Sequence, residues 1–322
     1  MAWSLFQKLF KRFVNPHIKD IKRDLWDAIL WRFGYYAEKK PREAPPDDFV
    51  YPGSTASYDP SQPWALWIGH STFLIRVNGL VFMTDPIFGS YCSPIHCNVF
   101  KRRHEPAIAM QDLPSVDCIM ISHNHYDHLD EQSVLELHRR NPNIVWVVPR
   151  GLKKWFERRH IHSVYELDWG QSYQLRSDCK ITAVPAQHFS GRHLWDKNRT
   201  LWCGYVMESR DKTFYFVGDT GYNFIDFKQI GARWPSIDLS MIPIGVYVPE
   251  KFMKPVHISP YEAVNIHCDT HSRLSLGMHW KTFRLSEEPM DRPPYDLYLA
   301  MKQKGLSVDT FLPIEPGRFI NW

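Results

Sequence analysis

The stretch that decides the fold covers residues 118–128 and reads CIMISHNHYDH. Its first four residues are apolar and predict a short buried strand. The residues that follow carry four potential metal ligands, three of them imidazoles: His123, His125, Asp127 and His128. These side chains cannot all share one face of a helix or strand, but a tight loop can turn them toward a common centre. Because imidazole and carboxylate suit zinc or iron, and one tetrahedral ion needs fewer ligands, the run predicts two ions.

Three further ligand candidates directly follow predicted strands, namely His188 after residues 181–184, Asp219 after 213–217 and His279 after 274–277. Asp219 lies within Gly-Asp-Thr-Gly, where the glycines allow a sharp backbone turn. Taken alone, each candidate is more often a hydrogen-bonded structural residue or part of a simple turn. Found together at successive strand ends, they favour a metal site.

Short β runs alternate with helices from residue 64 onward, which predicts an α/β layered domain. Strands are expected at residues 65–68, 72–77, 80–84, 118–121, 144–148, 181–184, 213–217 and 239–243, with Asn78-Gly79 as a hairpin turn. Helices are expected at residues 131–140, 151–159, 260–268 and 294–304. Hydrophobic residues make up 44% of the 322-residue chain, which is enough for a full core.

The charge argues against a strongly basic nucleic-acid binder, because the net charge is only +4. The first 23 residues hold six Lys or Arg and a single Asp, so the basic character belongs to the amino terminus. The six cysteines contain no C-x-x-C pair, which predicts reduced thiols and an intracellular location. The sequence has no signal-peptide pattern and no apolar run of about 18 residues, so we expect a cytoplasmic or peripheral membrane protein.

Residues 1–14 predict an amphipathic helix. Its apolar face would hold Trp3, Leu5, Phe6, Leu9, Phe10, Phe13 and Val14, and its polar face Ser4, Lys8, Lys11 and Arg12. A basic face opposite Trp, Phe and Leu is typical of a helix that lies in a lipid interface. The same pattern also fits a helix docked on its own protein or on a second subunit. Residues 40–63, rich in proline, predict a connecting arm.

Several strings resemble the metallo-β-lactamase superfamily, and within it the zinc phospholipases D that hydrolyse N-acyl-phosphatidylethanolamine. The H-x-H-x-D-H run with a later His, Asp and His is the metal pattern of the superfamily. The strings similar to the phospholipase branch are WIGHSTFL (67–74), TDPIF (84–88), CSPI (92–95), ISHNHYDHLD (121–130), GLKKW (151–155), ELDW (166–169), GDTGY (218–222), IPIG (242–245) and HWKTF (279–283). The resemblance covers residues 64–285 and implies an αββα sandwich with a dinuclear centre at the strand edges.

The residue patterns and the resemblance together predict an amphipathic helical segment at 1–35, a proline-rich arm at 36–63 and a metallo-β-lactamase-like hydrolase domain at 64–322. The resemblance also implies the arrangement of the metal site. It implies one zinc ion on His123, His125 and His188, and a second on Asp127, His128 and His279. Asp219 would bridge the two ions. Asp85 and His70 would hold ligand imidazoles in orientation, with a purely structural role as the alternative.

The implied reaction is attack of a metal-bridging hydroxide on the phosphodiester, with Asp127 and Asp219 as the catalytic carboxylates. The products would be an N-acylethanolamine and phosphatidic acid. The expected partners are a membrane phospholipid, the membrane surface and, by resemblance, a second copy of the chain in a homodimer. The residues expected to contact the substrate are Tyr126, Lys101, Arg102, Phe189, Arg192, Trp195, Tyr222 and His257.

The chain departs from the family at two stretches near the expected substrate pocket. Residues 99–103 keep a basic pair but lose the family's aromatic residue, and Phe189 follows Gln187-His188 where many members have Trp. Neither change touches a ligand. Both leave open a different phosphodiesterase or lactonase that acts on a soluble phosphate ester.

Other functions fit the sequence less well. A β-lactamase usually has a ligand Cys or a differently arranged His pair. A membrane-binding protein without catalysis has no use for seven ligands. An RNA-processing nuclease needs a basic face, which the near-neutral domain lacks.

Overall fold

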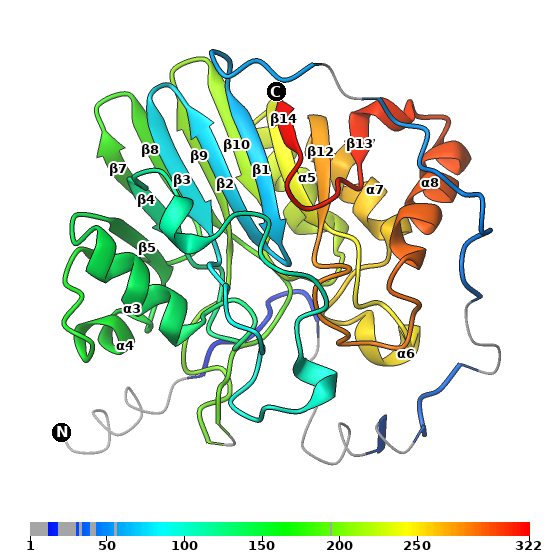
Figure 1. Cartoon of the computed structure of the whole chain (residues 1–322), viewed down its shortest axis with the longest axis horizontal. Coiled ribbons are helices and arrows are strands. Elements are labelled where there is room, and N and C mark those ends of the chain that lie inside the picture. The colour runs from blue at the N-terminus through cyan, green and yellow to red at the C-terminus, as the bar shows by residue number, and fades with distance from the viewer. Residues whose placement is uncertain (1–11, 19–29, 32–33, 39–42, 55–56, 194) are drawn as a thin grey trace.

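The structure is a computed structural model that describes residues 12–18, 30–31, 34–38, 43–54, 57–193 and 195–322. Two seven-stranded sheets lie face to face, and helices cover their outer faces (Figure 1). The predicted αββα sandwich is therefore confirmed. The described residues contain no helix that is both long and apolar enough to cross a membrane.

The first sheet has the strand order β14-β1-β2-β3-β4-β5-β6. Its strands are β1 (Trp64–Gly69), β2 (Thr72–Val77), β3 (Leu80–Thr84), β4 (Cys118–Met120), β5 (Val145–Pro149), β6 (Val164–Leu167) and β14 (Phe319–Asn321). Strands β14, β1, β2 and β3 pair antiparallel, whereas β3 to β6 pair in parallel. Asn78 and Gly79 both have positive φ at the β2–β3 turn, as the predicted hairpin requires.

The second sheet has the order β13-β12-β11-β10-β9-β8-β7. Its strands are β7 (Ser172–Arg176), β8 (Cys179–Val184), β9 (Gly204–Ser209), β10 (Lys212–Phe216), β11 (Ile237–Pro243), β12 (Ser272–Met278) and β13 (Phe311–Leu312). Strands β7 to β10 pair antiparallel, and β10 to β13 pair in parallel. Because parallel strands carry their carboxyl ends to one edge, loops from both sheets meet there.

The helices divide between the two outer faces. The first sheet is covered by α3 (Glu131–Arg140) and α4 (Lys153–Glu157), and the second by α5 (Phe224–Arg233), α7 (Pro260–Asp269) and α8 (Arg292–Lys304). A short helix, α6 (Glu250–Met253), follows β11, and 3-10 turns lie at Asn98–Phe100, Met110–Asp112 and Val308–Thr310. Helix α7 begins with a capping box in which Ser259 and Glu262 satisfy each other's backbone N–H groups.

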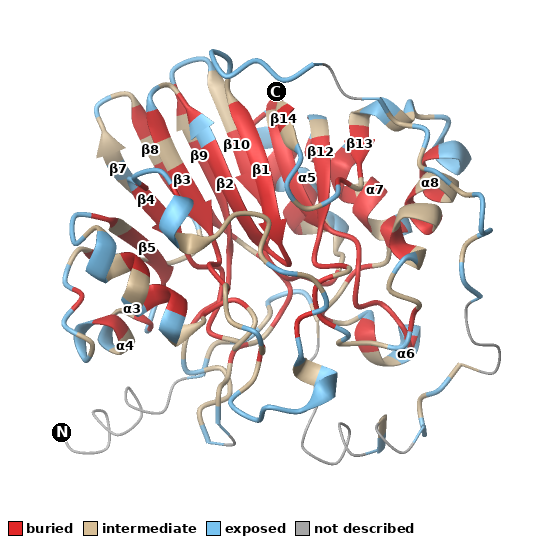
Figure 2. Ribbon diagram, in the orientation of Figure 1, coloured by how far each residue is buried: buried red, intermediate tan, exposed pale blue. Residues whose placement is uncertain are grey.

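The main core lies between the two sheets. Phe82 of β3 meets Phe214 of β10 edge to face, with ring centroids 5.5 Å apart. Trp67 and Tyr205 are also fully buried in this layer. Figure 2 shows buried residues along the strands of both sheets and on the inner sides of the helices. A rigid apolar layer of this kind can hold the loops at its edge in place.

The expected strands and helices are found, some with shifted ends, but the structure adds elements that the sequence analysis did not predict. These are β6, β7, β9, β13, β14, α5 and α6. The predicted amphipathic helix at residues 1–14 lies mostly outside the described residues, and its last three, Arg12 to Val14, are not helical. The division of the chain at residues 35 and 63 stays a prediction.

Helix α5 packs closely on the end of α7 at Gly231. A Cβ atom at Gly231 would lie 2.0 Å from the backbone oxygen of Asp269. We therefore expect Gly231→Ala to lower the free energy of unfolding by about 1–3 kcal/mol, because a backbone atom must shift. Urea unfolding measures the change. The control, Gln229→Ala, changes an exposed residue of the same helix and should alter stability little; equal stability of both variants would contradict the prediction.

Candidate metal centre

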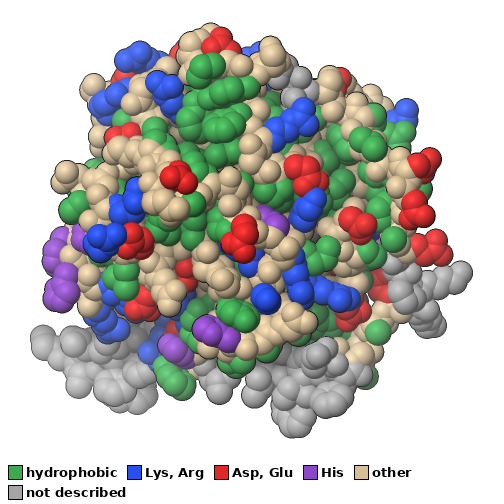
Figure 3. All heavy atoms as spheres, in the orientation of Figure 1, with side chains coloured by type: hydrophobic (Ala, Val, Ile, Leu, Met, Phe, Trp, Pro, Cys, Tyr) green, Lys and Arg blue, Asp and Glu red, His purple; other side chains and the backbone are tan. Residues whose placement is uncertain are grey.

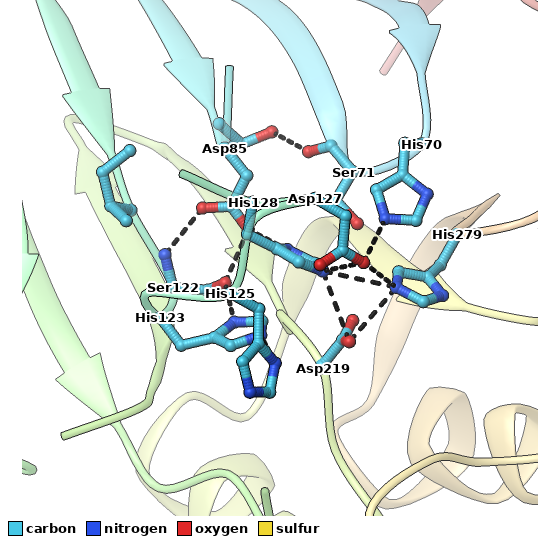
Figure 4. Close-up of polar contacts among 12 residues, drawn as sticks. His70, Ser71, Asp85, Ser122, His123, His125, Asp127, His128, Asp219 and His279 are labelled. Carbon is cyan, nitrogen blue, oxygen red and sulfur yellow. Dashed lines mark hydrogen bonds and ion pairs between the residues drawn. The ribbon is translucent and has the colours of Figure 1, made fainter. Parts of the chain in front are cut away.

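Every predicted metal ligand lies on a loop at one edge of the two sheets. The loop that joins β4 to α3 carries His123, His125, Asp127 and His128. His188 follows β8, Asp219 follows β10 and His279 follows β12. The close-up in Figure 4 shows the loop residues, Asp219 and His279 turned toward one another. Residues 156 positions apart in sequence thus converge on one centre.

The first cluster of donors consists of His123, His125 and His188. The Nε2 atom of His123 lies 2.8 Å from Nδ1 of His125, and Nε2 of His188 lies 3.3 Å from the same atom. His123 and His188 are each only 1% exposed. Three imidazole nitrogens therefore face a common point in a buried position.

The second cluster consists of Asp127, His128 and His279, with His70 beside them. The Nε2 atoms of His128 and His279 lie 3.3 Å apart, and Oδ2 of Asp127 lies 3.4 and 3.6 Å from them. Oδ2 of Asp127 is also 2.9 Å from Nε2 of His70. Their ligand atoms all lie within 4.8 Å of one another.

Asp219 stands between the two clusters. Its Oδ2 atom lies 3.1 Å from His279 Nε2, 3.3 Å from His128 Nε2 and 3.8 Å from His188 Nε2. Its Oδ1 atom is buried and has no hydrogen-bond partner among the described residues. The preceding Gly218 has φ +68°, and a Cβ there would lie 2.9 Å from Ser122 Cβ. The glycine therefore allows the close turn that places this carboxylate, as the sequence indicated.

Burial and charge set the protonation of the two clusters differently. Burial lowers the pKa of His125 to about 4, and those of His123 and His188 well below their usual range, so these imidazoles are neutral. Burial also disfavours the charged form of His279, but Asp219 and Asp127 outweigh it and raise the pKa to about 9. The same carboxylates raise the pKa of His128 well above its usual range.

The carboxylates of the centre are ionised. Burial alone would raise the pKa of Asp127 and of Asp219, but His128 and its neighbours lower both well below the usual range. Two buried negative charges need positive charge nearby. Without metal, the protons on His128 and His279 supply this positive charge. A bound cation would supply it instead, and its binding would release those protons.

The donor set fits divalent metal ions. It offers imidazole nitrogens and carboxylate oxygens, which are zinc ligands in proteins, in two groups with a carboxylate between them. The unpartnered Oδ1 of Asp219 is explained if it binds an ion. Among the described residues, no Cys belongs to these clusters.

Hydrogen bonds behind the ligands fix which nitrogen faces the centre. Oδ2 of Asp85 lies 2.7 Å from Nδ1 of His128, and Asp85 also accepts bonds from the backbone N–H and the hydroxyl of Ser122. Nδ1 of His188 lies 2.8 Å from the carbonyl oxygen of Val256. Such contacts leave Nε2 free to bind a metal and hold the ring in place.

Three residues of the centre have positive φ angles, a backbone conformation that residues other than glycine rarely adopt. The φ angles are +52° at His70, +30° at Asp85 and +63° at His279. Surrounding contacts compensate, since the backbone N–H of His279 donates to the carbonyl of His70 at 3.0 Å. Strain of this kind gathers at functional sites, where the geometry is held by the rest of the fold.

The structure brings together the seven predicted ligands and the two predicted supporting residues. Asp85 contacts a ligand imidazole, and His70 contacts the carboxylate of Asp127. Among the expected substrate contacts, His257 is close to the ligands, with Nδ1 3.8 Å from Asp219 Oδ2. Phe189 lies edge to face against His125, with centroids 4.5 Å apart.

Other expected substrate contacts are engaged in the protein. The guanidinium of Arg102 is buried and donates to the carbonyls of Ile87 and Gly89. The guanidinium of Arg192 donates to two carbonyls of the metal loop and lies 3.9 Å from the ring centroid of Tyr126. The hydroxyl of Tyr222 donates to Asp269. These contacts join parts of the protein to one another, so Arg102, Arg192 and Tyr222 have structural roles in this fold.

Lys101 and Trp195 are exposed, and a substrate contact for either stays a prediction.

Several residues that hold the ligands were not predicted from the sequence. Asn15 bonds both backbone groups of His188, and Asn124 accepts a bond from the backbone of Gly191. Of these supporting residues, only Ser122 could have been predicted from the sequence, because it lies between a predicted strand and the first ligand.

Comparisons with known proteins agree with this geometry. Residues 81–280 match the family model for the beta-lactamase superfamily domain. The N-acyl-phosphatidylethanolamine-hydrolyzing phospholipase D 1 of Caenorhabditis elegans is 40% identical over 264 residues, which cover 79% of this chain and 74% of that protein. The mitochondrial enzyme of the same name from Saccharomyces cerevisiae is 35% identical over 253 residues, which cover 77% of this chain and 53% of that protein. The chain therefore belongs to the metallo-β-lactamase superfamily.

Solved structures share the fold at lower identity. A metallo hydrolase from Ignicoccus hospitalis matches with a TM-score of 0.62 at 19% identity, covering 81% of this chain and 98% of that one. A possible metal-dependent hydrolase from Veillonella parvula matches with a TM-score of 0.64 at 15% identity, covering 81% and 100%. Family membership and the donor clusters together define a metal-dependent hydrolase whose relatives include proteins named as phospholipases D.

Asp85 supplies a test of how the centre is held. We expect Asp85→Asn to weaken metal binding by about 10–100-fold, because an amide cannot accept from Ser122 and His128 as the carboxylate does. Chelator competition followed by metal analysis measures the change. Asp117→Asn, at an exposed site before β4, is the control. Unchanged affinity in Asp85→Asn would show that this carboxylate does not position the ligands.

Proposed function

We propose that the chain is a binuclear zinc phosphodiesterase of the phospholipase D type. It would hydrolyse N-acyl-phosphatidylethanolamine to an N-acylethanolamine and phosphatidic acid. The observation that carries the proposal is the pair of donor clusters with Asp219 between them. Two relatives at 40% and 35% identity, both named for this reaction, support the substrate.

The number and kind of donors support two zinc ions. His123, His125 and His188 make one three-nitrogen group, and Asp127, His128 and His279 make a second group of mixed donors. Asp219 is within 4 Å of ligands in both groups, so one carboxylate can bind both ions. Imidazole and carboxylate ligands are typical of catalytic zinc, so each group could hold one such ion.

Bound divalent ions would supply Lewis-acid stabilisation of the phosphoryl oxygens and a water that is acidic enough to react near neutral pH. The chain's own residues hold the reacting groups in place. The His70 contact fixes Oδ2 of Asp127, which leaves that carboxylate oriented to accept a hydrogen bond from the attacking water.

The reaction balances with water as the only co-substrate. An oxygen of water forms a bond to phosphorus, and the bond from phosphorus to the ethanolamine oxygen breaks. The leaving oxygen takes up a proton, which gives the N-acylethanolamine hydroxyl. His257 would deliver that proton, because its Nδ1 is 3.8 Å from Asp219 Oδ2 and its side chain is 14% exposed.

A loop beside the centre offers a surface for lipid. Its residues Ile95 and Val99 are 66% and 44% exposed, and Lys101 and Arg103 are exposed next to them. The loop is tied to the centre, since Arg103 N donates to Thr282 O and the ring of Phe283 lies 5.2 Å from that of His70. Figure 3 shows Lys, Arg and hydrophobic side chains intermixed on this lower part of the molecule. Apolar and cationic groups together suit a phospholipid surface.

Removal of a metal donor tests the reaction. We expect Asp219→Asn and His125→Ala to lose bound metal and at least about 1,000-fold in kcat/KM, because the ions supply several kcal/mol of transition-state stabilisation. Mass spectrometry of products from a phospholipid panel measures turnover, and His193→Ala, an exposed histidine, is the control. Full hydrolysis by a metal-depleted variant would contradict the mechanism. Turnover of soluble phosphodiesters alone would favour a soluble ester as the substrate.

The basic residues of the amino-terminal segment provide a test of the proposed membrane contact. We expect Lys8→Glu with Lys11→Glu to weaken sedimentation with anionic vesicles by about tenfold or more, because each lysine near such a surface contributes about 1 kcal/mol. Hydrolysis of a short-chain soluble diester should be unchanged. The matched control reverses the same number of charges at Lys302 and Lys304, in the last turn of α8. Equal vesicle binding by both variants would contradict a role of the amino-terminal lysines in membrane binding.

A further inference from the structure

A short segment near the amino terminus, residues 12–18, lies against the loops of the metal centre. We call it the strap. The backbone N–H of Phe13 donates to the carbonyl of Asn198 at 2.9 Å, and Nε2 of His17 lies 3.1 Å from Oδ1 of Asp226 at the start of α5. Figure 1 shows the strap in blue, running below the strands among the loops that follow them. The strap lies outside the residues that match the family model.

Asn15 of the strap makes a two-point contact with a ligand. Its side-chain Nδ2 donates to the carbonyl oxygen of His188 at 2.8 Å, and the backbone N–H of His188 donates to Oδ1 of Asn15 at 3.1 Å. The amide of one side chain thus pairs with both peptide groups of one residue. The two residues are 173 positions apart in sequence.

The neighbours of His188 are held by other partners. The backbone N–H of Gln187 donates to Thr220 Oγ1, and its carbonyl accepts from Gly221. Both backbone groups of Ser190 pair with Asn198. His188 itself is 1% exposed, so its peptide groups are shielded from water and depend on the pairing that Asn15 provides.

The side chain and the backbone of His188 are fixed separately. The bond from Nδ1 to the carbonyl of Val256 sets the rotation of the ring. That bond does not set where the backbone of His188 lies, and a shift there moves Nε2 away from His123 and His125. Asn15 supplies this second restraint, because its planar amide holds the N–H and the carbonyl of the ligand at once.

We propose that Asn15 is a positioning residue of the metal centre, which holds the His188 backbone so that Nε2 completes the three-imidazole group with His123 and His125. The inference rests on the proposed binuclear centre. Among the described residues, Asn15 hydrogen-bonds to no other ligand of the centre, so its effect should fall on the ion held by His123, His125 and His188. The ion held by Asp127, His128 and His279 should be spared.

The experiment compares two Asn15 variants with a control from the same strap. Asn15→Ala removes both hydrogen bonds, and Asn15→Asp keeps an acceptor for the His188 N–H but sets a carboxylate against its carbonyl. His17→Ala loosens the strap at Asp226 without touching His188. Each full-length protein is stripped of metal, reloaded with zinc or cobalt, and titrated with a chelator. The absorption of bound cobalt reports ligand geometry, and circular dichroism reports folding.

We expect both Asn15 variants to bind one ion as the wild type does and the other about 10–100-fold more weakly, with an altered cobalt spectrum. His17→Ala should stay within about twofold of the wild type at both ions. Two ions with unchanged affinity in Asn15→Ala, or equal weakening of both ions in all three variants, would overturn the inference. Metal binding is measured without substrate. A wild-type protein that binds two ions but does not hydrolyse the phospholipid would therefore contradict only the proposed reaction. A wild type without metal would contradict both.

Discussion

The structure depends on one constraint, which is the placement of two ionised carboxylates, the buried Asp219 and the largely buried Asp127, among imidazoles at the edge of two packed sheets. Their charges raise the pKa values of His128 and His279, although burial alone would lower them. Such a group is costly to bury unless every charge is matched. Divalent cations match the charge and use the remaining lone pairs, so the same burial that makes the site costly also prepares it for metal.

Both sheets contribute ligands to the centre. Strand β4 of one sheet leads into the ligand loop, and β8, β10 and β12 of the other are followed by His188, Asp219 and His279. The apolar layer between the sheets is packed with fully buried aromatic residues, so the strand ends have little freedom. Behind the ligands, Asp85, Ser122 and the Val256 carbonyl orient the rings of His128, His123 and His188, respectively. A metal site built on two sheets in this way needs only short loops to aim its donors.

Much of the centre is visible in the sequence because it obeys local rules. A loop with three imidazoles and a carboxylate has few structural uses, and ligands that directly follow apolar runs point to strand ends. The contact between Asn15 and His188 has no such signal, since it joins an ordinary Asn-Pro turn to a loop 173 residues away. The strand β7 was missed because it has no buried residue and so no apolar pattern. Arg12 to Val14 were expected to be helical, but there the backbone of Phe13 bonds to Asn198 instead, so a tertiary contact overrides the periodicity.

In the proposed centre, the two donor clusters would hold two ions with Asp219 between them. Anomalous X-ray scattering at the zinc edge from crystals of the zinc-loaded protein tests it most directly. We predict two peaks about 3.5–4 Å apart, one among His123, His125 and His188 and the other among Asp127, His128 and His279. A single peak, or zinc bound away from Asp219, would contradict it.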